Sequence, residues 1–346
     1  MDKSQKVFTF GFLYNQKTNF FDFPLLESHL KKLSEESQTK IDCHFIEIQE
    51  IEAKTKEIPL LDMVCCLPAE APYISTVLQK YPNIKWVHSL FAGVDKFLQI
   101  EKVKKDSSII LTNARGAYSD ALAEYTILAL LYFNYNIPTY LTSFTKREWQ
   151  RPLNELVDKK TITIIGYGKN GIGIAKRVKP AFNMKVIGVV RVKRDNVEGK
   201  EYCDEVIGFD GLNDEIIGQS DYILATLPQT AQSVNLFDKK FFAKMKKTGI
   251  FINIGRGSAV VEDDLVEALT NGTIKGAVLD VTQKEPLDKT SKLYDVPKEK
   301  LLITNHSGDV TSSYVEQSYA VLLKNLKSYL MNNKKLETIV NKELGY

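Results

Sequence analysis

The sequence predicts an α/β protein with two domains, each built on a doubly wound parallel sheet. The chain has 346 residues, a length that suggests about two domains. Its N-terminal third alternates strand-like and helix-like segments, and a second series of the same kind begins at residue 161. Because strands that alternate with helices are joined by crossovers, both series indicate parallel sheets with helices on both faces.

The N-terminal third supplies the first series. Short apolar runs predict its strands, and helical spacing of apolar residues predicts its helices. The expected strands are residues 7–13, 41–48, 62–67, 84–89 and 109–112, and the expected helices are residues 24–34 and 72–80.

The stretch SLFAGVD at residues 89–95 follows the fourth of these strands. A glycine directly after a buried strand, here Gly93, is often only a turn. The alternative is that the backbone N–H groups of Ala92 and Gly93 bind an anion such as a carboxylate, although the residues taken alone favour the turn. The residues alone leave both interpretations open.

Residues 117–133 predict a long helix with Ser119 as its N-cap. The helix is apolar on most sides towards its C-terminal end. It is therefore either a core helix or a helix that is also buried against a second subunit. Residues 147–157 are polar and contain Pro152, so they predict an irregular surface segment.

The second series completes a doubly wound domain. After the strand at residue 161, further strands are expected at residues 185–190, 221–227, 249–254, 276–281 and 301–304. Helices are expected at residues 172–177, 239–245 and 262–270. A last helix, residues 312–330, follows the finished domain and is free to return to the first one.

A glycine-rich turn at the start of this series predicts a dinucleotide site. In TITIIGYGKNGIGIAK, residues 161–176, an apolar strand is followed by Gly166, Gly168 and Gly171 and then by a helix. The first glycine permits the tight turn, the second lets a pyrophosphate approach, and the third lets the helix pack on the strand. The helix N-terminus offers free N–H groups and a partial positive charge. Lys169 and Asn170 lie inside this turn and belong to the expected cofactor site.

The residues after the second strand of this series, residues 185–190, favour NADP over NAD as the cofactor. A domain that prefers NAD usually carries an acidic residue there, which bonds the ribose hydroxyls. Here the strand ends in a basic loop with Arg191, Lys193 and Arg194, which suit a 2′-phosphate. A solvated basic loop is the alternative, and the adjacent Asp195 leaves NAD open as a cofactor.

Composition excludes several other classes. The net charge of +3 is too small to indicate a nucleic-acid or anionic-membrane partner. The longest apolar run, residues 125–133, is far shorter than a membrane span. Residues 1–6 are polar and lead into a strand, so no signal peptide is expected. The four cysteines show no metal-ligand spacing, which predicts reduced thiols in a cytoplasmic protein without a metal site.

Three further stretches follow strands of the second series, where open α/β sheets bind ligands. They contain Arg256 in NIGRG, Asp280 and Glu285 in LDVTQKEP, and His306 in TNHSG. Each residue alone has an ordinary structural interpretation: a strand-end arginine, a turn carboxylate or a core histidine. Together, after the correct strands, they indicate a catalytic site.

At these residues the sequence resembles the D-isomer-specific 2-hydroxyacid dehydrogenases, over nearly the whole chain. The shared motifs are AGVD at 92–95, the segment from TNARG to AEY at 112–125, GYGKNG at 166–171, LP at 227–228, NIGRG at 253–257, LDV…EP at 279–286 and HSG at 306–308. The glyoxylate/hydroxypyruvate reductase branch is the most similar, mainly through the basic loop.

The resemblance implies an architecture and an assembly. A Rossmann nucleotide domain, residues 114–309, is expected to be inserted into a flavodoxin-like substrate domain, residues 1–113 and 310–346. A hinge at the two crossings is expected to close the domains over the substrate. The family is commonly dimeric through the nucleotide domain, so a homodimer is expected.

The resemblance also implies roles for site residues. His306 would give a proton to the carbonyl oxygen, and Glu285 would pair with His306 and raise its pKa. Arg256 would hold the substrate carboxylate, together with the N–H groups of Ala92 and Gly93. The remaining cofactor contacts implied by the family are Leu227, Pro228, Ile254, Arg256, Asp280, His306 and Gly308, with Asp280 on the nicotinamide amide or supporting the catalytic set.

Two departures from the family pattern stand near the site. Asn170 replaces an apolar residue, most often Ile, and Asn305 replaces a common Pro, which is expected to loosen the backbone before His306. Formate dehydrogenases are excluded because they carry Gln where Glu285 stands.

The leading hypothesis is therefore an NADP-dependent reductase of a small 2-oxo acid. The alternatives are a dehydrogenase of bulkier aromatic 2-oxo acids, an NAD-linked oxidation of a 2-hydroxy acid, and a dinucleotide-sensing protein like the C-terminal-binding-protein corepressors.

Overall fold

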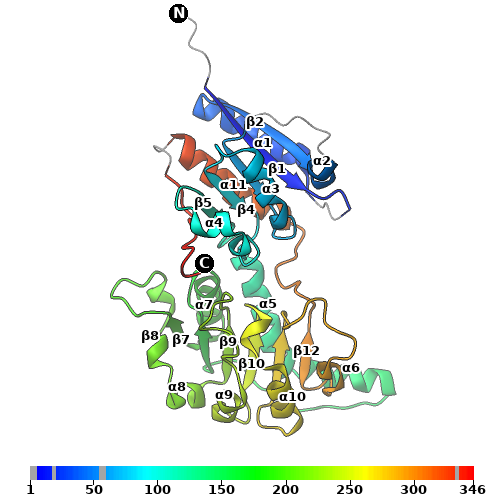
Figure 1. Ribbon diagram of the computed structural model, residues 1–346. Helices are drawn as coiled ribbons and strands as arrows, with labels where there is room; N and C mark the ends of the chain where they lie inside the picture. Colours follow the sequence, from blue (N-terminus) through cyan, green and yellow to red (C-terminus); the bar gives the residue numbers. More distant parts are fainter. Residues whose placement is uncertain (1–5, 18–20, 54–59, 332–334) are drawn as a thin grey trace, which may run out of the picture. The chain divides into compact units, whose positions relative to one another are not determined.

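The computed structural model describes residues 6–17, 21–53, 60–331 and 335–346. Its internal contacts divide the chain into two units: unit 1 is Met1–Ala117 with Ser312–Tyr346, and unit 2 is Tyr118–Thr311. Each unit contains one parallel sheet, of five and of seven strands (Figure 1). The predicted fold class is therefore confirmed. The expected domain boundaries near residues 113 and 310 stay predictions.

Unit 1 has the strand order β2-β1-β3-β4-β5, which is the flavodoxin-like order. Its elements are β1 (Val7–Tyr14), α1 (Phe23–Ser37), β2 (Lys40–Glu47), α2 (Ile48–Ala53), β3 (Met63–Cys66), α3 (Ala71–Lys80), β4 (Trp86–Ser89), α4 (Glu101–Lys105), β5 (Ile110–Asn113) and α11 (Tyr314–Met331). The segment after unit 2 thus returns to this sheet as α11.

Both faces of the unit 1 sheet are covered because its strands are apolar on both sides. On one face, α1 and α11 pack against Phe8, Phe10 and Phe12 of β1. On the other face, α3 and α4 pack against Val64 and Val87. Each fully buried side chain of this kind contributes about 1.5–3 kcal/mol relative to an exposed one.

Unit 2 has the strand order β12-β11-β10-β9-β6-β7-β8. Its elements are α5 (Ser119–Asn134), α6 (Ile137–Lys146), β6 (Thr161–Ile165), α7 (Lys169–Phe182), β7 (Lys185–Val190), β8 (Glu205–Gly208), α8 (Asp214–Gln219), β9 (Tyr222–Ala225), α9 (Lys239–Lys244), β10 (Ile250–Asn253), α10 (Glu262–Thr270), β11 (Gly276–Leu279) and β12 (Leu301–Ile303). The strand order reverses between β6 and β9, and ligands of doubly wound sheets bind outside the carboxyl ends at such a point.

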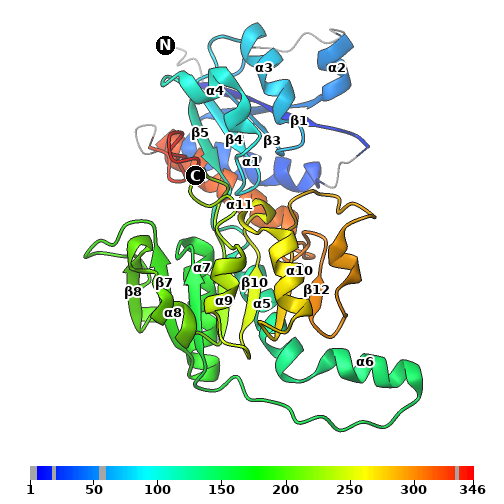
Figure 2. The same cartoon turned by 60° about the horizontal axis from the view of Figure 1, so that its bottom comes forward.

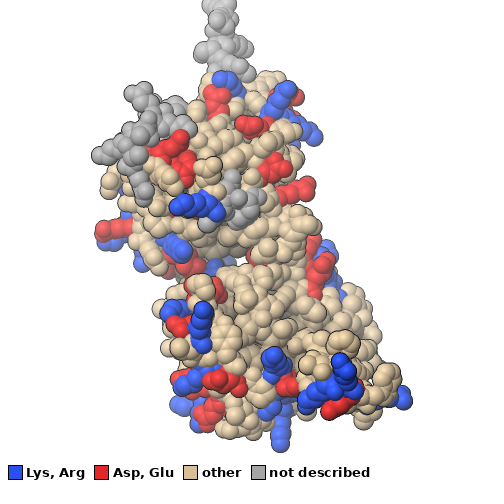
Figure 3. Space-filling model, turned by 90° about the vertical axis from the view of Figure 1, so that its right-hand side faces the viewer, with Lys and Arg blue, Asp and Glu red and all other residues tan. Residues whose placement is uncertain are grey.

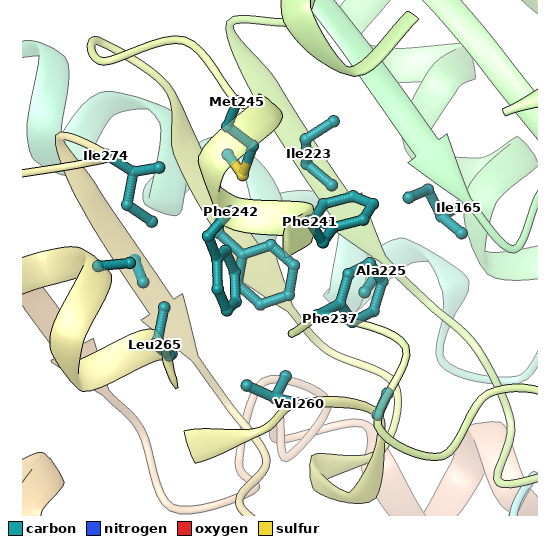
Figure 4. Close-up of a cluster of buried hydrophobic side chains, with 14 of the residues drawn as sticks. Ile165, Ile223, Ala225, Phe237, Phe241, Phe242, Met245, Val260, Leu265 and Ile274 are labelled. Carbon is teal, nitrogen blue, oxygen red and sulfur yellow. The ribbon is translucent and has the colours of Figure 1, made fainter. Parts of the chain in front are cut away.

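The core of unit 2 lies on both faces of this sheet. On one face, α5 and α7 cover Ile162, Ile164 and Leu224. Figure 4 shows part of the other face, where aromatic side chains from α9 and the segment before it fill the space beside β9; the residues drawn include Phe237, Phe241, Phe242, Met245 and Ile223.

Three elements of unit 2 were not expected from the sequence: α6, β8 and α8. The strand β8 and the helix α8 are only 4 and 6 residues long, too short for a periodic pattern. The helix α6 is rich in Thr and aromatic residues, which are poor helix formers. It lies at one end of unit 2, and the segment after it crosses back to β6 without regular structure (Figure 2).

Cysteines and membrane-spanning potential complete the description. None of the four cysteines forms a disulfide. Burial raises the pKa of the Cys65 and Cys66 thiols well above the ordinary value of a cysteine. Among the described residues, no helix is both long and apolar enough to cross a bilayer. No cluster of metal-ligating side chains forms within the same residues.

A buried histidine makes the stability of unit 1 depend on pH. His88 of β4 is fully buried, and its Nδ1 lies 2.7 Å from Thr112 Oγ1. No described residue bonds its Nε2. Burial lowers the pKa of His88 to about 3.

We expect the unfolding free energy of unit 1 to fall as the pH decreases from about 6.5 towards 3, because only the unfolded state protonates His88 in this window. The slope due to this residue approaches about 1.4 kcal/mol per pH unit. Urea unfolding monitored through the fluorescence of buried Trp86, in a Trp149→Phe background, measures it. His88→Asn should remove this slope and His44→Asn should keep it; equal slopes in both variants would contradict the prediction.

Candidate active site

The glycine turn after β6 is open where a dinucleotide needs backbone access. Gly166 has a φ of +104°, and a Cβ at this position would lie 2.7 Å from Thr226 Oγ1, so only glycine fits. A Cβ on Gly171 would lie 3.0 Å from the carbonyl oxygen of Gly166, which reflects close packing of α7 on the turn. At Gly168, by contrast, a Cβ would meet no atom within 4 Å.

The N-terminus of α7 begins directly after this turn. Its N-cap, Gly168, provides no side-chain hydrogen bond to the first N–H groups of the helix. Uncapped N–H groups and the helix dipole form an anion site. An open glycine and an uncapped helix at the switch point of the sheet fit the pyrophosphate of a dinucleotide.

The side chains of Lys169 and Asn170 have partners within unit 2. Lys169 Nζ forms an ion pair with the carboxylate of Glu198. Asn170 Oδ1 accepts a hydrogen bond of 2.9 Å from the hydroxyl of Ser119 on α5. Ser119 is therefore not the N-cap of α5, as the sequence predicted; Tyr118 occupies that position, without a side-chain cap.

The basic loop follows β7, the strand next to β6. The side chains of Arg191, Lys193 and Arg194 are exposed. Within the described residues, none of the three forms an ion pair or a hydrogen bond through its side chain. These three cations are therefore accessible to an anionic ligand.

Arg256 is placed by a tight loop after β10. The Asn253 side chain accepts a hydrogen bond of 3.0 Å from Gly255 N–H and donates one of 3.0 Å to the carbonyl oxygen of Arg256. A Cβ on Gly257 would lie 1.9 Å from the carbonyl carbon of Thr282. The backbone of the Arg256 loop therefore lies directly against the loop that carries Glu285.

His306 and Glu285 form a hydrogen-bonded pair. His306 Nδ1 lies 2.8 Å from Glu285 Oε2, and Thr282 N–H donates to Glu285 Oε1 at 3.1 Å. Because a carboxylate only accepts, Nδ1 carries a proton and Nε2 is left to exchange one. The hydrogen bond that Nδ1 donates to Glu285 raises the pKa of His306 above its ordinary value.

The carboxyl of Glu285 shifts in the opposite direction. Burial alone would raise its pKa, but the hydrogen bond and charge of His306, the Thr282 N–H and the charge of Arg256 outweigh burial. The pKa of Glu285 therefore lies below its ordinary value, and this residue stays ionised when His306 gains or loses a proton.

Asp280 holds the loop that carries His306. Its carboxylate accepts hydrogen bonds from Ser307 N–H at 2.9 Å and Gly308 N–H at 3.0 Å. Its carbonyl oxygen accepts one of 2.5 Å from His306 N–H. Asn305 and His306 have φ values of 52° and 53°, a left-handed conformation that costs roughly 1–2 kcal/mol per residue. Proline cannot adopt this φ, so Asn305 gives the backbone a different geometry, and the loop is hydrogen-bonded rather than loose.

The other expected cofactor residues lie at the same strand ends. Leu227 and Pro228 follow β9, and Ile254 follows β10. A Cβ on Gly255 would lie 2.6 Å from the Leu227 nitrogen, so these two loops are in close contact. The cofactor roles of these residues stay predictions.

Ala92 and Gly93 belong to unit 1. Their carbonyl oxygens are bonded inside their own unit, by Asn113 Nδ2 at 2.7 Å and Ser89 Oγ at 3.2 Å respectively. Their N–H groups find no acceptor among the described residues. The expected binding of a carboxylate by these two groups stays a prediction.

Sequence reasoning missed two residues at this site, Tyr125 and Thr304. Tyr125 OH lies 2.6 Å from Thr304 Oγ1, and Thr304 Oγ1 donates to Asp280 Oδ1 at 2.7 Å. Tyr125 belongs to an apolar helix and Thr304 directly follows β12, so neither position carries a local signal of this contact.

Comparisons with known proteins identify the family of this chain. A family model, the D-isomer specific 2-hydroxyacid dehydrogenase NAD binding domain, matches residues 127–308. Glyoxylate/hydroxypyruvate reductase B of Pectobacterium carotovorum is 30% identical over 331 residues, which cover 91% of this chain and 97% of the relative. A probable 2-ketogluconate reductase of Dictyostelium discoideum is 31% identical over 265 residues, which cover 74% of this chain and 76% of that protein.

A solved structure is similar over the full length. It is an NADPH-dependent glyoxylate/hydroxypyruvate reductase from Sinorhizobium meliloti in complex with NADP and sulfate, with 25% identity and a TM-score of 0.76. The similarity covers 99% of this chain and 100% of that one. A doubly wound sheet with an open glycine turn at its switch point defines a dinucleotide-binding α/β protein. The chain belongs to the D-isomer specific 2-hydroxyacid dehydrogenase family and is thus an enzyme that uses NAD or NADP, which confirms the resemblance found in the sequence.

Gly168→Ala should separate cofactor binding from folding. The added Cβ points into open space, so we expect an unchanged melting temperature. Because the methyl group would stand where a pyrophosphate approaches, the Kd for NADPH and NADH should rise about 10-fold or more, measured by fluorescence titration. Gly218→Ala in α8, where a Cβ makes only an ordinary contact, is the matched control. A Kd that is unchanged in Gly168→Ala would exclude this turn as the pyrophosphate site.

Proposed function

We propose that the enzyme reduces a small 2-oxo acid, glyoxylate or hydroxypyruvate, to the D-2-hydroxy acid with NADPH. The observation that carries this proposal is the 2.8 Å pair between His306 and Glu285, with Arg256 on the neighbouring strand end. A cation for the substrate carboxylate and a protonated imidazole for its carbonyl oxygen are the groups that this reduction requires.

In this mechanism each residue has one task. A bound NADPH supplies the hydride that reduces the carbonyl carbon. The guanidinium of Arg256 holds the carboxylate of the substrate, together with the N–H groups of Ala92 and Gly93. His306 gives the proton on Nε2 to the carbonyl oxygen. Glu285 keeps Nδ1 protonated and stabilises the imidazolium until the proton leaves.

The basic loop supports the preference for NADPH. Arg191, Lys193 and Arg194 are exposed cations after β7, where this fold binds the adenosine ribose. Guanidinium groups match the geometry of a 2′-phosphate. The NADP-bound relative from Sinorhizobium supports the same preference.

Initial rates test the proposal. The oxidation of NADPH and of NADH is measured with glyoxylate, hydroxypyruvate, pyruvate and phenylpyruvate. The highest kcat/KM is expected for NADPH in combination with glyoxylate or hydroxypyruvate. The triple variant Arg191→Ala, Lys193→Ala, Arg194→Ala should raise the KM for NADPH and leave that for NADH unchanged. Faster turnover of phenylpyruvate would favour a larger substrate. Tight dinucleotide binding with no turnover would favour a sensing protein.

The pH profile of the reaction tests His306 as the proton donor. His306→Ala should lower kcat by about 10²–10⁴-fold, the usual contribution of a positioned proton donor. Glu285→Gln removes the partner that raises the pKa of His306, so the imidazolium is lost at lower pH. The alkaline decline of kcat/KM should therefore shift to lower pH. His29→Ala, on α1 of unit 1, is the control. An alkaline decline that stays in place in Glu285→Gln would contradict the assigned roles.

We propose a homodimer that forms through unit 2. The helix expected to carry the interface, α5, is largely buried in the core of its own unit; Leu128 remains 53% exposed. The exposed apolar surface lies instead on α6 and the segment after it, with Phe144 86%, Trp149 93% and Leu153 95% exposed. A broad part of unit 2 on the side to which α6 points carries no charged side chain (Figure 3). Such a patch is typical of a subunit interface.

Light scattering at micromolar protein measures the mass. Wild type should give twice the 39.2 kDa of one chain. Phe144→Asp with Leu153→Asp should give a monomer, because two charges would be buried in the interface. Leu60→Asp, an exposed leucine of unit 1, should stay dimeric. A monomeric wild type would refute the dimer.

A cytoplasmic location is the remaining part of the proposal. The free thiols of the four cysteines support it, since reducing compartments keep thiols in this state.

A further inference from the structure

We propose that Tyr125 and Thr304 are positioning residues for His306: a one-way hydrogen-bond chain from Tyr125 through Thr304 to Asp280 fixes the loop that presents the imidazole. The inference rests on the proposed role of His306 as proton donor. It adds two residues, on α5 and after β12, that form no hydrogen bond with His306 or Glu285 in the described part of the chain.

The chain consists of two short hydrogen bonds. Tyr125 OH and Thr304 Oγ1 are 2.6 Å apart, and Thr304 Oγ1 and Asp280 Oδ1 are 2.7 Å apart. Tyr125 is 9% exposed and Asp280 only 2%. Thr304 between them is half-buried. Both ends of the hydrogen-bond chain are thus largely shielded from water, and a buried group that loses its partner is destabilised.

The direction of the chain follows from counting protons. Three protons reach the Asp280 carboxylate: those of Thr304 Oγ1 and Ser307 N–H on Oδ1, and that of Gly308 N–H, which is shared between Oδ1 and Oδ2. A carboxylate oxygen accepts hydrogen bonds and donates none. The single hydroxyl proton of Thr304 therefore goes to Asp280, and Thr304 can only accept from Tyr125. Burial raises the pKa of Tyr125, which keeps the proton that it donates.

The far end of the chain determines where His306 lies. Asp280 binds the His306 loop through its carbonyl oxygen and its carboxylate, as described above. The same loop holds two consecutive residues, Asn305 and His306, in the left-handed region. Such a conformation persists only where surrounding contacts impose it. The hydrogen bond from Thr304 Oγ1 fixes the rotation of the Asp280 carboxylate. The carbonyl oxygen of Thr304 accepts a hydrogen bond from the Ser307 hydroxyl.

A substitution can distinguish a purely structural role of Tyr125 from its role as a hydrogen-bond donor. Its ring packs on Gly308, where a Cβ would lie 3.2 Å from Tyr125 Cγ. Tyr125→Phe keeps the ring and this packing and removes only the donor. If the residue merely filled space, this variant would leave catalysis unchanged.

Steady-state kinetics of the full-length enzyme test the chain. Tyr125→Phe should lower kcat about 10-fold, the effect of one lost hydrogen bond in a partly buried position, with the KM values for both substrates unchanged. Thr304→Val should lower kcat further and Thr304→Ser should restore it. Tyr132→Phe, on the same helix, should be neutral. Because Thr304→Val already leaves Tyr125 without an acceptor, the double variant Tyr125→Phe with Thr304→Val should be no slower than Thr304→Val alone.

Several results would refute the proposed role of this hydrogen-bond chain. These are additive effects in the double variant, a raised KM at constant kcat, or no recovery in Thr304→Ser. A wild type without turnover would refute the proposed function instead, and the chain is then tested by the NMR signals of the His306 ring. Tyr125→Phe should shift these signals and Tyr132→Phe should not; signals that stay in place in both variants would refute the chain.

Discussion

The register of four neighbouring parallel strands in unit 2 is the constraint on which the site depends. Asn253 of β10 pairs with Ala225 of β9 and Leu279 of β11, and Leu279 pairs with Ile303 of β12. Adjacent strands lie about 4.8 Å apart, so loops that leave them at the same level start as immediate neighbours. Arg256, Glu285 and His306 stand on three such loops. A slip of one residue would turn every strand side chain to the other face and misalign all three.

The fold and the principal site residues were predictable because their causes are local or periodic. Apolar runs indicated eleven of the twelve strands that the described residues form, and the spacing of Gly166, Gly168 and Gly171 indicated the switch-point turn. The helices and strands that escaped prediction, α2 and α4 in unit 1 and α6, β8 and α8 in unit 2, are short or lack the helical pattern. Their formation depends on neighbours that a linear pattern does not contain.

The parts of the site that escaped prediction are contacts between side chains distant in sequence. Tyr125 and Thr304 are separated by 179 positions, and Ser119 and Asn170 by 51. Ser119 also shows a competition: the sequence assigns it to capping α5, but the hydroxyl bonds Asn170 on α7 instead. Which partner a hydroxyl takes depends on the packing of two helices, and that packing is a property of the folded domain.

The return of α11 to unit 1 has a consequence for folding during translation. Tyr319, Leu322 and Leu326 of α11 cover part of one face of the unit 1 sheet, yet unit 2 is synthesised before them. At ribosomal speeds this delay is on the order of ten seconds or more. The nascent sheet therefore emerges with Phe8, Phe10 and Phe12 incompletely covered, while unit 2, a contiguous segment, can fold without waiting. Unit 1 therefore completes its core only after the whole of unit 2 has left the ribosome.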